Sequence, residues 1–197
     1  MTALAIAPPA EHTNGHRPPP FVIFSASTNK THYNITAALG IGRVALETAR
    51  YDPATGARQQ FLRFFLTVGH AKLLTYLVLE SRLIRNGWKF ERFAGSVRGD
   101  TVISRALVLQ FDDGDGKYQS YPFRIIIKEG PGETTKTGAI TPKGSATDTV
   151  DTRVPFETFL ESMIELRDWL RERQPRIEQQ RWDEQMERYH RKQGRRE

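Results

Sequence analysis

Residues 58–87 read RQQFLRFFLTVGHAKLLTYLVLESRLIRNG, and their pattern changes halfway along. The run Phe61–Val68 is mostly aromatic and aliphatic, which is typical of a largely buried β-strand. From His70 onward the leucines recur at the spacing of an α-helix that is apolar on most sides, so we expect other parts of the protein to cover it. Asn86-Gly87 predicts the end of this helix, because glycine adopts a left-handed conformation without steric cost. The stretch therefore predicts a strand that passes directly into a helix.

Three further strands are predicted before this stretch. They are separated by turn-forming residues, of which Asp52–Gly56 is the strongest signal. The predicted strands are Phe21–Ser25, His32–Leu39 and Arg43–Tyr51. Residues 21–87 thus read as four strands and a helix, ββββα.

The same order recurs in residues 88–174. Apolar residues at helical spacing follow Pro155, a residue favoured in the first helical turn, and Gln174-Pro175 predicts the end of this second helix. Two segments are predicted as loops, Gly95–Asp100 and the mobile Gly130–Gly144. Asp112–Gly116 predicts a tight hairpin, since it lacks the Glu of a calcium-binding loop. The predicted strands are Trp88–Phe93, Val102–Phe111, Lys117–Lys128 and Thr147–Val154.

These elements predict an α+β fold of two ββββα repeats, in which antiparallel sheets pack with helices. Residues 21–174 form the globular domain, with halves at about 21–87 and 88–174. Residues 1–20 contain five prolines and no periodic apolar pattern, which predicts a disordered arm. Residues 175–197 are highly charged, and either a helical extension or a disordered tail fits them.

Composition narrows the classes of function. The chain of 197 residues has no cysteine, which excludes disulfides and thiolate metal sites and is consistent with a cytoplasmic protein. No apolar run approaches the length of a membrane span. The net charge is +6, but residues 71–170 hold 14 Lys and Arg against 14 Asp and Glu, so the excess lies toward the two ends. A nucleic-acid partner fits this charge without being required by it.

Catalytic motifs are missing from the sequence. No serine lies in a G-x-S-x-G turn, and the glycine-rich segments match neither nucleotide-binding fingerprint. The five histidines have no metal-ligand spacing. We therefore expect a protein that is not an enzyme and that carries no metal or cofactor.

Aromatic and basic residues alternate on several predicted strands. Such surfaces bind single-stranded nucleic acid, because bases stack on rings while cations contact phosphates. The ordinary alternative is that strands are rich in Phe and Tyr in any fold, with solvated Lys and Arg on the outer face. The candidate binding residues are Lys30, Tyr33, Arg43, Arg58, Phe61, Arg63, Lys89, Phe90, Arg92, Arg105, Tyr118, Tyr121, Phe123, Arg124, Lys128, Lys136 and Lys143.

The repeated ββββα order resembles that of the Whirly family of single-stranded-DNA-binding proteins, and of the PUR-alpha and mitochondrial guide-RNA-binding proteins. Thr36–Leu39 resembles the end of the family's Lys-Gly-Lys-Ala-Ala-Leu segment, although Asn34 and Thr36 replace its two lysines. Arg58–Gly69 resembles the family's passage from strand to helix, Arg105–Lys128 its central hairpin, and Val154–Leu170 its closing helix. The resemblance implies a homotetramer in which the apolar helices meet centrally and the sheets radiate outward. A helix lying between two sheets of a monomer would equally explain the apolar pattern.

The leading hypothesis is therefore binding of single-stranded nucleic acid, DNA more than RNA, with low sequence specificity. The alternative is a non-catalytic subunit of a larger assembly that binds protein partners through its terminal segments; the balanced charge of residues 71–170 favours it. A hydrolase or nuclease has no supporting motif.

Overall fold

The computed structural model of the chain describes residues 21–28, 30–38, 41–112 and 118–193, and for residues 181, 185 and 188–193 it describes the backbone alone. The predicted arm of residues 1–20 and most of the Asp112–Gly116 turn lie outside the described residues. Among the described residues, no helix is long and apolar enough to cross a membrane.

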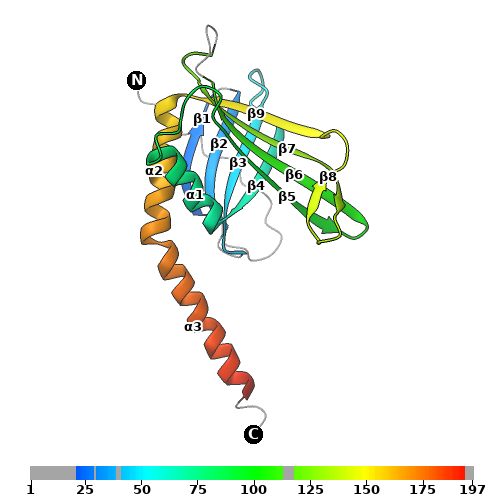
Figure 1. Cartoon of the computed structure of the whole chain (residues 1–197), viewed down its shortest axis with the longest axis vertical. Helices are drawn as coiled ribbons and strands as arrows, with labels where there is room; N and C mark the ends of the chain where they lie inside the picture. The colour runs from blue at the N-terminus through cyan, green and yellow to red at the C-terminus, as the bar shows by residue number, and fades with distance from the viewer. Residues whose placement is uncertain (1–20, 29, 39–40, 113–117, 194–197) are drawn as a thin grey trace.

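The first half forms a four-stranded antiparallel sheet, here called sheet A, with its strands in chain order (Figure 1). Thr67 caps the helix that follows, because its side-chain oxygen accepts a hydrogen bond from the backbone N–H of His70 at 3.2 Å. The strand therefore passes into the helix without a loop, as the sequence predicts. The elements are β1 (Phe21–Ser27), β2 (Thr31–Ala38), β3 (Arg43–Tyr51), β4 (Arg58–Thr67) and α1 (Val68–Leu79).

The second half forms sheet B, in which one edge of β7 has two successive partners. β9 pairs with Phe123–Glu129 of β7, and the short β8 pairs with Gly132–Thr134 further along the same edge. The elements are β5 (Lys89–Arg98), β6 (Thr101–Phe111), β7 (Phe123–Thr134), β8 (Ile140–Pro142), β9 (Asp148–Val154), α2 (Phe156–Glu172) and α3 (Gln174–Gln193).

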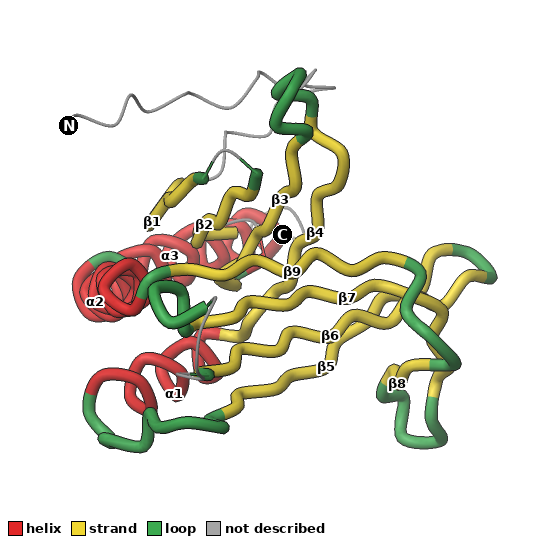
Figure 2. The backbone as a smooth tube through the Cα atoms, turned by 90° about the horizontal axis from the view of Figure 1, so that it is seen from above, coloured by secondary structure: helices red, strands yellow, loops and turns green. Residues whose placement is uncertain are grey.

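A single core lies between the two sheets and the helices. Each strand sends alternate residues inward: Leu62, Phe64 and Leu66 of β4 pack against Leu107 and Leu109 of β6 and their neighbours. Figure 2 shows α1 and α2 at one end of this sandwich and β8 at the opposite end. Each sheet thus has an inner face toward the core and an outer face directed away from it.

The α+β architecture of two antiparallel sheets packed with helices agrees with the prediction, but the second half has a different detail. Gly130–Gly144 is not a loop: it contains the end of β7 and the additional strand β8, and we call residues 135–147 the β8 hairpin. Gly95–Asp100 is not a loop either, since β5 continues to Arg98. Conversely, the strand predicted from Lys117 begins only at Phe123.

Helix α1 ends earlier than predicted. The Ser81 hydroxyl donates to the Leu77 carbonyl at 2.5 Å, its backbone N–H bonds Tyr76, and Arg82 then has a positive φ of 54°. Gly87, with φ of 78°, instead forms the turn that starts sheet B, where the N–H of Trp88 bonds the Arg85 carbonyl. The segment after Leu79 is therefore a connection between the two halves.

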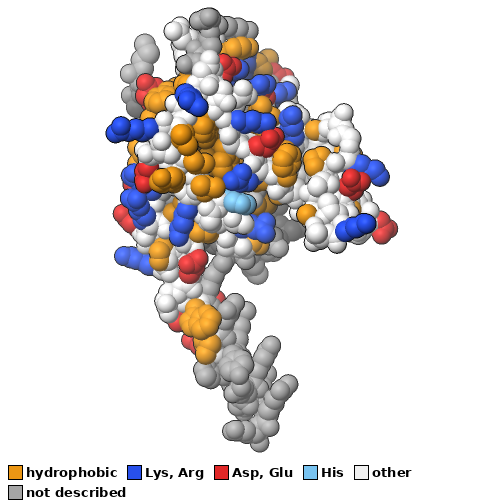
Figure 3. Space-filling view, in the orientation of Figure 1, with side chains coloured by type: hydrophobic (Ala, Val, Ile, Leu, Met, Phe, Trp, Pro, Cys, Tyr) orange, Lys and Arg blue, Asp and Glu red, His pale blue; other side chains and the backbone are white. Residues whose placement is uncertain are grey.

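Part of the helical surface is uncovered in the single chain. In the single chain, Leu73 and Tyr76 of α1 are 40% and 53% exposed. Figure 3 shows hydrophobic side chains gathered over this part of the molecule, with Lys and Arg around them. Beyond α2, the helix α3 extends away from the body (Figure 1).

Candidate nucleic-acid interface

The outer face of sheet A carries a row of aromatic and basic side chains. Because Leu62, Phe64 and Leu66 point into the core, the intervening Phe61, Arg63 and Phe65 of β4 point outward and are only partly buried. The Arg63 guanidinium lies 5.3 Å from the centre of the Phe61 ring and 5.8 Å from that of Phe65, close enough for cation–π attraction to both. The Arg58 guanidinium also lies over Phe61, 5.2 Å from the centre of its ring.

Small residues of the neighbouring strand β3 form the floor beside this row. Ala49 pairs with Phe61 and Ala45 with Phe65, so the rings stand above methyl groups. Between the alanines, Glu47 is 5% exposed, and its carboxylate lies 2.5 Å from the Arg63 side chain. The carboxylate also accepts a hydrogen bond from the Thr36 hydroxyl at 3.2 Å. Arg63 is therefore held in place between two rings by a buried counter-charge.

His32 lies at the end of this face, opposite Ala49. Its Nδ1 is 2.5 Å from the Ser27 hydroxyl oxygen. Burial lowers the pKa of His32, and this outweighs the opposite effects of the nearby Glu47 carboxylate and of a hydrogen bond with Asn34. His32 is thus neutral in the folded protein at pH 7.

The outer face of sheet B is built around one exposed ring. Phe93 of β5 is 56% exposed and pairs with Ala106 of β6, which in turn pairs with Lys128 of β7. The β8 hairpin closes over one side of this area and leaves a cleft of about 410 Å³. Its lining residues are Glu91, Phe93, Ser104, Ala106, Val108, Lys128, Glu129, Gly130, Pro131, Pro142, Gly144, Ser145 and Ala146.

Three of the aromatic residues predicted to bind bases are part of the core instead. Tyr33 is 1% exposed, and its hydroxyl lies 3.3 Å from the Ser162 hydroxyl of α2; burial raises the pKa of this phenol. Phe123 is fully buried and stacks on Phe159 at 4.0 Å between ring centres. Phe90 is 3% exposed. These predictions were wrong, because a ring packed against other core side chains has no free face for a base.

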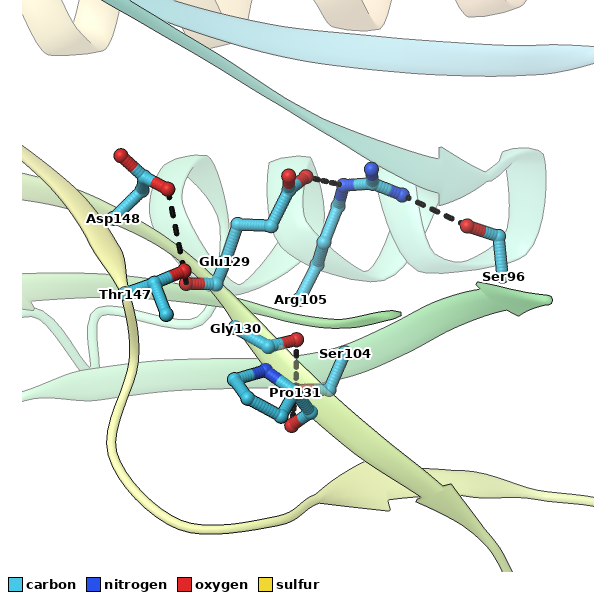
Figure 4. Close-up of polar contacts among 8 residues, drawn as sticks. All are labelled: Ser96, Ser104, Arg105, Glu129, Gly130, Pro131, Thr147 and Asp148. Carbon is cyan, nitrogen blue, oxygen red and sulfur yellow. Dashed lines mark hydrogen bonds and ion pairs between the residues drawn. The ribbon is translucent and has the colours of Figure 1, made fainter. Parts of the chain in front are cut away.

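Several predicted cations are already engaged. The Arg105 guanidinium bonds the Glu129 carboxylate at 2.5 Å on the inner face of sheet B, and it reaches toward Ser96 (Figure 4). Arg92 lies over the buried Phe90 ring at 4.3 Å. Arg124 forms a forked pair with Asp151, a hydrogen bond that raises its pKa. We expect these residues to contribute less to phosphate binding than unpaired lysines would.

The predicted tyrosines and the remaining cations are distributed around the two sheets. Tyr118 and Tyr121 are 45% and 43% exposed, but they lie in the segment before β7 and not on a strand, and Arg153 covers the Tyr118 ring at 4.0 Å. Lys30 and Arg43 lie at opposite ends of β2 and β3. The other exposed cations are Arg58 at the start of β4, Lys89 on β5, Lys128 on β7, and Lys136 and Lys143 beside β8.

Two of the best-placed rings, Phe65 and Phe93, are not among the candidate residues. Their signal was present in the alternation of the strands: Phe65 has the same parity as Phe61, and Phe93 the opposite parity to the buried Phe90. No group of three or more His, Asp or Glu side chains in the described part of the chain could hold a metal ion. The arrangement offers stacking and charge contacts.

Comparison with known proteins identifies the fold. No family model matches the chain, and no curated protein matches it. The crystal structure of WHY1 from Arabidopsis thaliana superimposes with a TM-score of 0.50 at 11% sequence identity, covering 79% of this chain and 91% of that one. The structure of WHY3 from the same plant gives a TM-score of 0.47 at 10% identity, covering 80% and 89%. The superposition on WHY1 shows that this chain has a Whirly-like fold, as its element order predicts.

Proposed function

We propose that this protein binds single-stranded nucleic acid, DNA in preference to RNA, with little sequence preference, on the outer faces of its two sheets. The observation that carries the proposal is the β4 row, in which Phe61 and Phe65 lie on either side of Arg63 over a floor of alanines. Its resemblance to the single-stranded-DNA-binding Whirly family supports the same function. The protein is proposed to act by binding alone and not as an enzyme.

The chemistry of the faces accounts for the preference for single strands. Unpaired bases stack on the open sides of rings, and each stacked base contributes about 1–3 kcal/mol. In a duplex the bases are already stacked inside the helix, so the rings reach none of them. Arg58 and Arg43 stand near the two ends of the sheet A face, where they can contact phosphates. Every base has a flat face, so little sequence preference follows.

The test is a titration of the protein into fluorescent oligo-dT and into a matched duplex, read by anisotropy from about 50 to 200 mM salt. We expect salt-sensitive binding to the single strand that exceeds binding to the duplex. Phe61→Ala with Phe65→Ala should weaken oligo-dT binding, whereas Tyr118→Ala, in the segment before β7 and on neither sheet face, should not. Equal binding to strand and duplex, or an affinity independent of salt, would contradict the proposal.

We further propose that the protein is a homo-oligomer joined through α1 and α2. Leu73 and Tyr76 of α1 and Ile164 of α2 are exposed in the single chain. A second copy would cover them. A tetramer is the state that the Whirly resemblance implies, and analytical ultracentrifugation would distinguish it from a monomer.

A second function, binding of protein partners within a larger assembly, is favoured by helix α3. Trp182 and Met186 lie one turn apart on this helix and are 60% and 36% exposed. Removing residues 1–20 and 175–197 separates the two functions. Capture of a protein partner should then be lost, whereas binding of single strands by the sheets should persist.

A further inference from the structure

The β8 hairpin is fitted closely against the outer face of sheet B. A Cβ atom added at Gly95 of β5 would lie 2.4 Å from the Ile140 side chain and 2.6 Å from the Ile103 carbonyl oxygen. At Gly132 of β7 it would lie 3.0 Å from Ile140, and at Gly130 it would lie 2.9 Å from the backbone of Ala146. Three strand positions on β5 and β7 thus lack side chains where the hairpin crosses. The hairpin is part of a preformed surface.

The cleft lies between the hairpin and the outer face of sheet B. Its floor is formed by Ala106 and Val108 of β6 and by Gly130 of β7, whose side chains are small or absent. Phe93 of β5 also lines the cleft, as do Pro142, Gly144, Ser145 and Ala146 of the hairpin. A volume of about 410 Å³ lies within the range of pockets that hold one small organic molecule.

The lining residues of the cleft suit a flat, weakly polar ligand that carries a negative charge. Phe93 leaves 56% of its surface open. The Ser104 hydroxyl on the floor is already bonded to the Pro131 carbonyl at 2.9 Å, and the Glu91 carboxylate is paired with Lys89 at 2.9 Å. Lys128 at the rim forms no ion pair with another described residue. The cleft therefore offers the Phe93 ring, an apolar floor and the Lys128 cation.

We propose that this cleft holds one unstacked nucleobase of a bound strand, with the base against Phe93 and the adjoining phosphate near Lys128. The inference rests on the proposed function, and it adds a defined subsite on sheet B. Both lining carboxylates have a cationic partner, Glu91 with Lys89 and Glu129 with Arg105, so the Lys128 cation beside the exposed Phe93 ring favours a nucleotide over a peptide side chain. Because the floor side chains have no free donor directed at the ligand, the subsite accepts different bases.

The test compares oligo-dT with an oligomer of the same length that carries only abasic sites, using wild-type protein and the variant Phe93→Ala. Val97→Ala is the matched control, since Val97 also lies on β5, is 58% exposed, and does not line the cleft. Loss of one stacked base predicts that Phe93→Ala weakens oligo-dT binding by about fivefold or more. The abasic oligomer should bind both proteins equally, and Val97→Ala should match the wild type.

The outcomes separate the subsite from the proposed function. If wild-type protein binds oligo-dT and Phe93→Ala binds it equally well, the cleft holds no base, although the function stands. If Phe93→Ala loses the same factor on the abasic oligomer, the effect is not stacking and the proposal fails. If wild-type protein binds neither oligomer, the proposed function itself fails. Phe93→Trp, which retains a ring, should preserve the affinity, and thermal unfolding verifies that each variant folds.

Discussion

On sheet A, β4 sets Phe61 and Phe65 on either side of Arg63, and no described segment folds over that face; on sheet B, the β8 hairpin crosses the outer face and leaves a cleft beside Phe93. Both sheets follow the same ββββα plan. One added hairpin, together with glycines beneath it, changes an open face into one with a cleft. The ion pairs on the two sheets also differ in burial. On sheet A the Glu47 carboxylate is buried beneath Arg63, whereas on sheet B both members of the Arg124–Asp151 pair are partly exposed.

The largest expected effect is on the glycines under the hairpin. Gly95→Ala should lower the free energy of unfolding by about 2–3 kcal/mol, because the new methyl group meets the Ile103 backbone, which cannot swing aside. Gly69→Ala in the first turn of α1 is the matched control. There the nearest atom is 3.9 Å away, and we expect no loss of stability. Urea denaturation of both variants measures the difference, and equal stability would mean that neither Ile103 of β6 nor Ile140 of the hairpin closes off the space beside Gly95.

A smaller effect is expected from the counter-charges on the two faces. Glu47→Gln should cost about 1–2 kcal/mol, because it leaves Arg63 without its buried partner. Asp151→Asn removes the corresponding acid on sheet B, where both side chains are about one-third exposed, and should cost about 0–1 kcal/mol. Denaturant midpoints at low salt would show this order, and the reverse order would contradict the assignment of the more tightly held pair to sheet A.

The smallest effect is a pH dependence on the sheet A face. The pKa of His32 is lowered from 6.5 by burial, so below pH 6.5 the unfolded chain binds a proton that the folded protein does not. Stability should therefore fall as the pH drops from about 7 to 5. His32→Gln should reduce this slope, whereas His70→Gln at an exposed site should retain it. Identical slopes in wild-type protein and His32→Gln would refute the prediction.

The elements were largely predictable from the sequence, and the faces were only partly so. Strand alternation alone places Phe123 with Ile125 and Ile127, and therefore in the core. Our error was to treat each strand's aromatic residues as one set. The same alternation correctly groups Phe61 with Arg63 on the outside. The alternation of side chains between the two faces of each strand was therefore the information that we did not use in choosing the candidate residues.

The cleft could not have been predicted from local pattern. Gly130–Gly144 has the composition of a loop. The reason for glycine at positions 130 and 132 is visible only in the fold, where residues 140–146 lie against β5 and β7 and leave no room for a side chain. Likewise, the leucine spacing predicts a longer α1, because Leu83 and Ile84 continue the periodic pattern. The hydrogen bonds of Ser81 to the preceding turn end the helix first. Both differences arise from contacts that composition does not encode.

Helix α3 has a mechanical consequence. Its 20 residues span roughly 30 Å, and its first turn contacts the body, where Gln174 is 5% exposed and Ile177 packs beside the core. The helix therefore extends from the body as a spacer (Figure 1). Whatever binds near Trp182 is held at a set distance from both sheets, and in a homo-oligomer each copy would contribute one such arm. The number of arms, and so the avidity for a multivalent partner, would follow directly from the number of subunits.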